Sequence, residues 1–348
     1  MAPMREPRFW YPPRRGAAPL LPSRLLAPAG WLFGMAGRIR RRRAVSERAA
    51  VPVICIGNLT AGGAGKTPVA LTIAERLMAA GEAVHFLTRG HGGRERGPIR
   101  VDPARHSAAD VGDEPLLLAA AAPTWVSARR PEGAAAAVRG GARLVVMDDG
   151  FQNPYLVKDF SILVVDAASG VGNGRLMPAG PLRERIDDAL ERAHAIVLNG
   201  RGHAADGLAA RARARGLPVF NAITRPVSPP DFAGVPLLAF AGIGRPEKFY
   251  RTLADLGAEI VETVDFADHH MYSERDALQL LVKARERGAR LVTTEKDAAR
   301  LTHAPVGSAR ARLREAAMQL PVRALIADID TLMALIADAA RRARRRQS

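Results

Sequence analysis

A glycine-rich segment between an apolar run and a predicted helix constrains this chain more than any other feature. The β-branched run Val51–Ile56 predicts a buried strand, the loop after it closes on Gly65-Lys66-Thr67, and Val69–Leu77 predicts an apolar helix. Such a strand–loop–helix unit binds phosphate, because glycines let backbone N–H groups turn towards the anion and the helix N-terminus adds a positive dipole end. Lys66 would reach the β- and γ-phosphates of a nucleotide, and Thr67 would ligate Mg²⁺.

The loop departs from the usual P-loop spacing at one position. Thr60 stands where the pattern GxxxxGK[ST] has its first glycine, although three other glycines follow it. A simple glycine-rich turn with an incidental lysine is the alternative, but it does not explain why strand, loop, Lys-Thr pair and helix occur in order. The residues predicted to hold the nucleotide are Thr60, Ala61, Gly62, Gly63, Ala64, Gly65, Lys66 and Thr67.

Apolar runs alternate with helical stretches along the rest of the chain, which predicts a mostly parallel sheet covered by helices on both faces. Ligands of such folds bind beyond the carboxyl ends of the strands. The predicted strands after the P-loop are Val84–Thr88, Leu144–Met147, Ser161–Asp166, Ala195–Leu198, Leu217–Ala222, Leu237–Ala241, Ile260–Val264, Leu291–Thr293 and Val322–Ile326.

The predicted fold is therefore α/β: a P-loop NTPase-like sheet flanked by helices, a second smaller α/β domain and an amphipathic N-terminal segment. A proline-rich stretch at 226–236 predicts the linker between the two domains. The expected division is an N-terminal segment at 1–43, a P-loop domain at 44–225, the linker, a smaller domain at 237–340 and a basic tail at 341–348.

The positive charge of the chain is concentrated at its two ends. The formal net charge is +16, and residues 1–50 hold eleven arginines against Glu6 and Glu47, while 341–346 adds five more. Basic ends of this kind bind nucleic acid or an anionic membrane surface, unless they are only solvated tails. The single cysteine, Cys55, excludes a disulfide framework and fits a reducing compartment.

The N-terminal segment favours the membrane over nucleic acid. Leu25–Gly37 is uncharged and contains Trp31, Leu32 and Phe33, and it is followed by Arg38 and four consecutive arginines at 40–43. This run is shorter than the roughly 20 apolar residues that span a bilayer. It is typical of a helix lying in the membrane interface, whereas Pro28 and Gly30 favour two short pieces. The alternative is a segment that only packs on the protein body.

Acidic and histidine-containing clusters follow several of the predicted strands. Asp148 and Asp149 end an apolar run, where P-loop proteins place a carboxylate that holds Mg²⁺ directly or through water. Asp113 and Glu114 precede a proline at a predicted helix start, and either could assist a metal or accept a proton from a hydroxyl. Adjacent histidines at 269 and 270 point in different directions, so that a joint metal site is not expected and one of them would tune a carboxylate.

Taken together, these motifs resemble the tetraacyldisaccharide 4'-kinase family, the lipid A 4'-kinases of Gram-negative bacteria. The resemblance runs from about residue 15 to about residue 330, and the P-loop of that family also lacks the first glycine. His91 stands where a tyrosine is common in the family. The matching segments are GNLTAGGAGKTP (57–68), TRGHGGR (88–94), GDEP (112–115), DDGFQ (148–152), PAGPLRE (178–184), FADHH (266–270) and TEKDAARL (294–301).

The resemblance implies phosphorylation of the 4'-hydroxyl of an acylated glucosamine disaccharide 1-phosphate by ATP and Mg²⁺, at the cytoplasmic face of the inner membrane. It implies that Asp113, His269 and Lys66 are catalytic. Acidic residues near the metal would be Glu114, Asp148 and Asp149, together with Thr67. The substrate would be bound by Asn58, Arg89 and Arg183.

Two other classes of function remain as alternatives at this point. One is a P-loop GTPase or a metallochaperone-type ATPase, but Ala61 stands where many of those ATPases have a second lysine, and TEKD imitates the guanine motif NKxD only loosely. The other is a nucleic-acid-binding ATPase, but the sequence has no zinc-ligand set or aromatic RNA-binding motif, and no nucleic-acid partner is expected.

Overall fold

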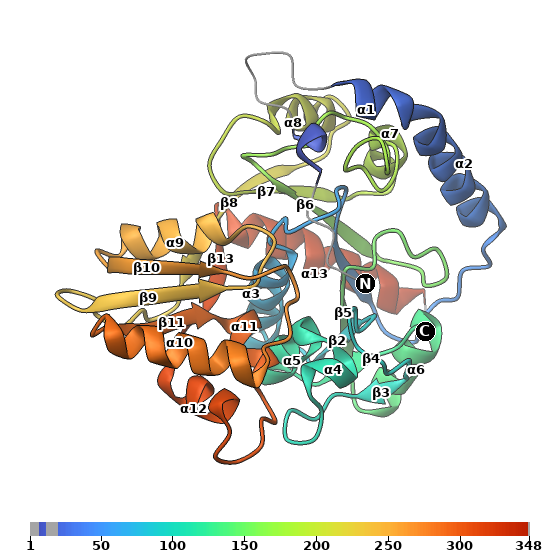
Figure 1. Cartoon of the computed structure of the whole chain (residues 1–348). Coiled ribbons are helices and arrows are strands. Elements are labelled where there is room, and N and C mark those ends of the chain that lie inside the picture. The colour runs from blue at the N-terminus through green and yellow to red at the C-terminus, as the bar shows by residue number, and fades with distance from the viewer. Residues whose placement is uncertain (1–6, 12–19, 347–348) are drawn as a thin grey trace.

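Two sheets organise the chain in the computed structural model, which describes residues 7–11 and 20–346 (Figure 1). The larger sheet has nine strands in the order β13-β8-β7-β6-β1-β5-β2-β4-β3 and is parallel except for the pairs β13·β8 and β3·β4. Its strands are β1 (Val53–Asn58), β2 (Val84–Thr88), β3 (Ile99–Arg100), β4 (Thr124–Val126), β5 (Leu144–Asp148), β6 (Phe160–Asp166), β7 (Ala195–Asn199), β8 (Val219–Pro226) and β13 (Val322–Ile326).

Helices cover both faces of this sheet, as the buried β-branched strands require. Ile54 and Ile56 of β1 face one core, and Val53 and Cys55 face the other, because successive side chains alternate across a strand. The first core is closed by α3 (Lys66–Ala79), α5 (Asp113–Ala121) and α13 (Ile329–Arg345). The second is closed by α6 (Arg130–Arg139), α7 (Ile186–Leu190) and α8 (Asp206–Arg213).

The smaller sheet is parallel throughout, in the order β10-β9-β11-β12. It consists of β9 (Pro236–Ala241), β10 (Glu259–Asp265), β11 (Arg290–Thr294) and β12 (Met318–Leu320). One of its faces packs on α9 (Pro246–Asp255), and the other on α10 (Glu274–Glu286) and α12 (Ala309–Ala316). Between the two sheets, α11 (Glu295–Arg300) contacts α5 and α4 (Ala108–Val111). The predicted mostly parallel α/β fold with a second, smaller domain is confirmed.

The structure differs from the expected domain division at the C-terminal end. Val322–Ile326 was predicted as a strand of the smaller domain, but it pairs antiparallel with β8 at the edge of the larger sheet. The helix that follows buries Leu332 and Ile336 in the first core, so the chain returns to the larger domain after β12. The arginines expected in a tail at 341–348 instead form the end of α13 as far as Arg345, and residues 347–348 lie outside the described part.

The N-terminal segment forms a short 3₁₀ helix, Arg8–Trp10, and two α-helices, α1 (Leu20–Leu25) and α2 (Ala27–Arg43), that lie along the outer rim of the larger domain (Figure 1). The two helices are separated at Leu26, which is the N-cap of α2. Pro28 falls in the first turn of α2, where the absence of a proline N–H costs no helical hydrogen bond. No helix among the described residues is long and apolar enough to cross a membrane. Residues 1–6 and 12–19 of the predicted segment lie outside that part.

Candidate active site

The predicted phosphate-binding loop joins β1 to α3 at the carboxyl edge of the larger sheet. Gly65 begins the helix at φ +82°, and a Cβ there would lie 2.1 Å from Nδ2 of Asn199, so that both the backbone conformation and the space require glycine. The Asn58 side chain donates to the carbonyl oxygens of Thr60 (2.7 Å) and Gly62 (3.3 Å). These contacts fix the start of the loop, in which Gly63 is exposed and Gly62 and Gly65 are half-buried.

Lys66 and Thr67 face the two carboxylates that end β5. The Nζ atom of Lys66 lies 3.6 Å from Oδ1 of Asp149, and Oγ1 of Thr67 lies 3.4 Å from Oδ2 of Asp148. Asp149 also accepts a 2.8 Å hydrogen bond from Arg183. Burial opposes ionisation of Asp149, but Lys66 and Arg183 outweigh it and lower its pKa. The P-loop cation, the P-loop hydroxyl and the strand-end carboxylates therefore meet in one place, as the motifs predicted.

Asp148 differs from its neighbour because its charge is not compensated. Its side chain is fully buried, and its Oδ1 atom has no hydrogen-bond partner. Burial and the nearby charge of Glu114 raise the pKa of Asp148 to about 7. A buried carboxylate oxygen without a partner is costly, and a divalent cation beside it would remove that cost.

The donor set fits Mg²⁺ rather than an ion held by protein ligands alone. The part of the chain that is described holds no group of three or more His, Cys, Asp and Glu side chains able to chelate a metal. Mg²⁺ in kinases is held by one or two carboxylates together with water and the phosphates of the substrate. Asp148 beside the Thr67 hydroxyl matches that requirement.

Asp113 lies at the start of α5 and contacts the smaller domain. Its Oδ2 atom accepts a 3.2 Å hydrogen bond from Nδ1 of His269 and a 3.0 Å hydrogen bond from Nε of Arg300, whose Nη2 atom also contacts it. Its Oδ1 atom accepts from the backbone N–H of Glu114 at 2.9 Å. Burial would raise the pKa of Asp113, but His269, Lys296 and Arg300 outweigh it and hold the pKa well below its usual range.

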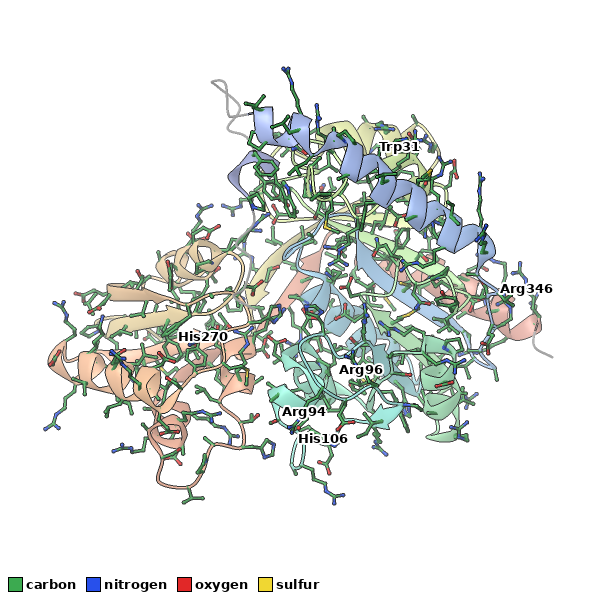
Figure 2. The ribbon with its side chains drawn as sticks, turned by 45° about the vertical axis from the view of Figure 1, so that its right-hand side comes forward. Trp31, Arg94, Arg96, His106, His270 and Arg346 are labelled. Atoms are coloured by element: carbon green, nitrogen blue, oxygen red, sulfur yellow. The ribbon has the colours of Figure 1, made fainter. Side chains whose placement is uncertain are left out.

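Each of the paired histidines has its own carboxylate. His269, at φ +59°, directs its ring to Asp113, and the hydrogen bond to that carboxylate raises the pKa of His269. His270 lies in the smaller domain (Figure 2), and its Nε2 atom is 3.0 Å from Oδ2 of Asp276 in the first turn of α10. The ring of His91 meets that of His269 edge-on, at a centroid distance of 5.7 Å. Of the two histidines, only His269 contacts Asp113.

The remaining predicted residues take different positions. Glu114 binds Nζ of Lys296 at 2.7 Å, and the charge of that lysine lowers the pKa of Glu114. Arg89 follows β2 and is exposed. Asn58 is fully buried, and its amide nitrogen is used within the P-loop, so that contact with a substrate would involve its Oδ1 atom, which has no hydrogen-bond partner.

Three residues of the site, Arg300, Asn199 and Gln152, were not singled out from the sequence. Arg300 is 2% exposed and joins Asp113 of the larger domain to Asp297 (2.7 Å) and the Gly242 carbonyl (2.6 Å) of the smaller one. Lys296 binds Glu114 across the same boundary, Asn199 donates to the Ala64 carbonyl at 3.3 Å, and Gln152 donates to the Asn58 carbonyl and to Glu184. Arg300 lies within the TEKDAARL segment and Gln152 within the DDGFQ segment, and membership of these segments is the sequence feature that could have identified them.

Comparisons of the sequence and of the fold with known proteins agree with one another. The family model for tetraacyldisaccharide-1-P 4'-kinase matches residues 22–341. A tetraacyldisaccharide 4'-kinase of Parvibaculum lavamentivorans is 76% identical over 343 residues, covering 99% of this chain and 100% of the relative. One from Rhodospirillum centenum is 50% identical over 336 residues, covering 96% of each. The fold matches a crystal structure of LpxK from Aquifex aeolicus in complex with ATP, with a TM-score of 0.70 and 24% identity over 91% of this chain and 99% of that one.

Proposed function

This chain belongs to the tetraacyldisaccharide-1-P 4'-kinase family, and we propose that it transfers the γ-phosphate of ATP to the 4'-hydroxyl of an acylated glucosamine disaccharide 1-phosphate. The observation that carries this proposal is the pairing of Asp113 with His269 across the two domains, beside a P-loop. A nucleotide on the loop and a sugar hydroxyl at Asp113 would then meet between the domains.

In this mechanism Asp113 accepts the proton of the sugar hydroxyl. The hydroxyl oxygen forms a bond to the γ-phosphorus, and the bond from that phosphorus to the β,γ-bridging oxygen breaks, releasing ADP. The lowered pKa of Asp113 makes it a weak base, but the transition state of phosphoryl transfer is loose and demands little base strength. The orientation of the Asp113 carboxylate by His269 and Arg300 then contributes more to catalysis than its basicity does.

Lys66 neutralises charge on the transferred group, as P-loop lysines do. Mg²⁺ would be held by Asp148 and Thr67, with Glu114 and Asp149 nearby, and it would neutralise phosphate charge when bound. Arg183 is held against Asp149 at 2.8 Å, and Arg89 is exposed at the same edge of the sheet, so both are available to a phosphate of ATP or to the 1-phosphate of the lipid.

We infer that the chain acts as a peripheral protein on the anionic cytoplasmic face of the inner membrane. In α2 the usual arrangement of an amphipathic helix is reversed. Its inward face carries Gly30 and Gly34, packed on Leu176, together with Arg41, which binds Asp188 at 2.9 Å. Its outward face carries apolar side chains that are 38–64% exposed, namely Trp31, Leu32, Phe33, Met35 and Ile39 (Figure 2).

A helix whose apolar side chains face away from the protein supports membrane contact, because a soluble protein would otherwise expose them to water. The segment also packs on the body through its inward face, which is compatible with membrane contact through its outward face. Of the arginines expected to meet headgroups, Arg38 and Arg41 instead bind carboxylates of the body, which leaves Arg40, Arg42 and Arg43 exposed for lipid.

The Trp31→Asp/Leu32→Asp variant is expected to bind vesicles of phosphatidylglycerol at least about tenfold more weakly than the unchanged chain, because each large apolar side chain contributes roughly 1.5–3 kcal/mol on burial. Vesicle co-sedimentation measures this. The matched control is Leu278→Asp/Val282→Asp on α10, where both side chains are similarly exposed. Equal partitioning of the two double variants would contradict the membrane assignment of α2.

The proposed reaction is tested by transfer of labelled γ-phosphate from ATP to a tetraacyldisaccharide 1-phosphate in mixed micelles with Mg²⁺. The expected result is labelled lipid with the unchanged chain and no labelled lipid with the Lys66→Ala variant. ATP hydrolysis without labelled lipid would contradict the kinase proposal and favour an ATPase switch.

A further inference from the structure

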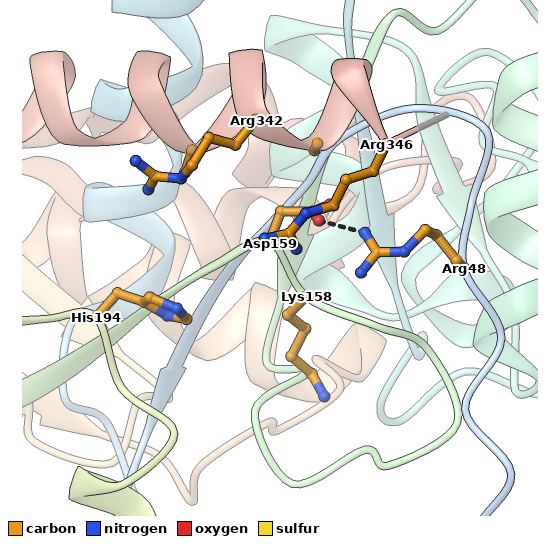
Figure 3. A pocket seen from close by; sticks show the side chains of 8 residues that line it. Arg48, Lys158, Asp159, His194, Arg342 and Arg346 are labelled. Carbon is orange, nitrogen blue, oxygen red and sulfur yellow. Dashed lines mark hydrogen bonds and ion pairs between the residues drawn. The ribbon is translucent and has the colours of Figure 1, made fainter. Parts of the chain in front are cut away.

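A second basic site lies at the opposite edge of the larger sheet from the P-loop. A cleft of about 170 Å³ opens where β6 and β7 begin, and it is closed on one side by α13. Arg346 extends from α13 towards Asp159 and Arg48, whereas Arg342 extends from the same helix on the side of His194 (Figure 3). The nucleotide loop lies at the carboxyl ends of these parallel strands, whereas this cleft lies at their amino ends.

The concave shape comes from the spacing of residues on α13. Ala339, Arg342, Ala343 and Arg346 share one face of the helix, since they follow each other at intervals of three or four residues. The two alanines are 3% and 1% exposed and leave room between the helix and the strands, while the two arginines reach over that room. At about 30 Å³ per water molecule, the cleft has space for a group the size of a phosphate.

Cationic side chains outnumber the carboxylates that face the cleft. Asp159 is occupied, because it accepts from Arg48 at 2.5 Å and from the backbone N–H of Val53 at 2.9 Å. Arg342 contacts the exposed Asp338 on its own helix. Within residues 7–11 and 20–346, the guanidinium group of Arg346 has no hydrogen bond or ion pair. Arg346 is exposed to solvent, so its guanidinium group is available to an anion that enters the cleft.

Two further groups favour an anion. The Nδ1 atom of His194 accepts the backbone N–H of Ser161 at 3.0 Å, so in the neutral ring Nε2 carries the proton and is a donor. Burial, together with the charge of Arg342, lowers the pKa of His194 and favours this neutral form. Lys158 turns away from α13 to the Asn153 carbonyl (Figure 3), so it adds its charge to the surroundings without occupying the cleft.

We propose that this cleft binds a phosphate-bearing anion through Arg48, Arg342 and Arg346, at a site separate from the nucleotide site. Guanidinium groups suit this ligand because their N–H donors match phosphate oxygens in pairs. Arg48 lies five residues beyond the end of α2, the helix with the exposed apolar face. The phosphate therefore belongs either to the headgroup of an anionic lipid in the same membrane or to a free phosphate-bearing solute.

The test compares the full chain with two double variants of equal charge. Arg342→Ala/Arg346→Ala removes the cleft arginines, and the control Arg312→Ala/Arg314→Ala removes two exposed arginines of α12. Inorganic phosphate is titrated by calorimetry while a non-hydrolysable ATP analogue saturates the P-loop. The cleft variant is expected to bind phosphate at least about tenfold more weakly, and the control within about twofold of the unchanged chain. Unchanged affinity for the ATP analogue verifies that the variants are folded.

A second measurement separates the two sources of the phosphate. If the cleft variant binds both phosphate and phosphatidylglycerol vesicles more weakly, the phosphate belongs to a lipid headgroup. If it binds only phosphate more weakly, the phosphate belongs to a free solute. Phosphate affinity equal to that of the control variant overturns the proposal. It is also overturned if only vesicle binding weakens, because surface charge without a defined site would then explain the result.

Discussion

Replacing Asp113 by asparagine is expected to lower kcat by about 10²–10³-fold while leaving the affinity for ATP within about twofold of the unchanged enzyme. The asparagine keeps the size of the side chain but cannot accept the proton of the sugar hydroxyl. Since the Asp113 carboxylate contacts His269 and Arg300 of the smaller domain, the nucleotide loop is not altered directly. Steady-state kinetics with lipid substrate, together with equilibrium binding of ATP, measure the two quantities separately.

The two adjacent histidines provide a matched control for this prediction. His269→Gln should lower kcat because it removes the group that orients Asp113, whereas His270→Gln should leave kcat nearly unchanged because His270 contacts Asp276 instead. Lys66→Ala should impair both ATP binding and turnover. An Asp113→Asn enzyme with near-normal kcat would remove Asp113 from the role of base, and equal losses in the two histidine variants would remove His269 from the role of orienting Asp113.

Replacing Arg300 by methionine is expected to lower the free energy of unfolding by about 3–5 kcal/mol. Methionine fills much of the same space without charge, so Asp113 and Asp297 would remain buried, 4% and 0% exposed, without the guanidinium group that contacts both of them. Burial alone would raise the pKa of Asp113, and Arg300 offsets this together with His269 and Lys296. The variant should therefore lose both stability and turnover. Denaturant unfolding measures the loss of stability, and kcat measures the loss of turnover.

The control for Arg300 is an exposed arginine of the same domain. Arg287 forms a 3.2 Å ion pair with Glu262 at the surface, and Arg287→Met should cost no more than about 1 kcal/mol. Arg300→Lys restores the charge but not the guanidinium geometry, so it should recover more stability than turnover. An Arg300→Met enzyme as stable as the Arg287→Met enzyme would show that the buried contacts do not hold the domains together.

Local patterns predicted most of the larger strands because buried parallel strands are continuous apolar runs. Val84–Thr88 is an example whose predicted and observed bounds agree. The strands β3, β4 and β12 have only two or three residues, which is too short for a periodic pattern, and they were not predicted. The bounds of Val322–Ile326 were predicted correctly but its sheet was not, because strand pairing depends on residues about a hundred positions away.

In the candidate site, too, features set by neighbouring residues were predicted, whereas contacts between distant residues were not. A local run of residues predicted Lys66 and Thr67 opposite strand-end carboxylates, since strand, loop and helix are consecutive in the chain. From its own residues, the sequence left the partner of Asp113 open. His269 lies 156 positions away and Arg300 lies 187, and chemical type alone does not indicate such pairs.

The sequence by itself determined that this protein has a phosphate-binding loop on a parallel α/β sheet, because each part of that unit is specified by neighbouring residues. It also determined the apolar and basic character of α2. Only the tertiary structure decided that α2 turns its apolar side outward, that α13 returns to the larger domain, and that the buried Arg300 contacts Asp113 beside His269. These outcomes depend on which distant surfaces pack together, and packing selects among partners that are far apart along the chain.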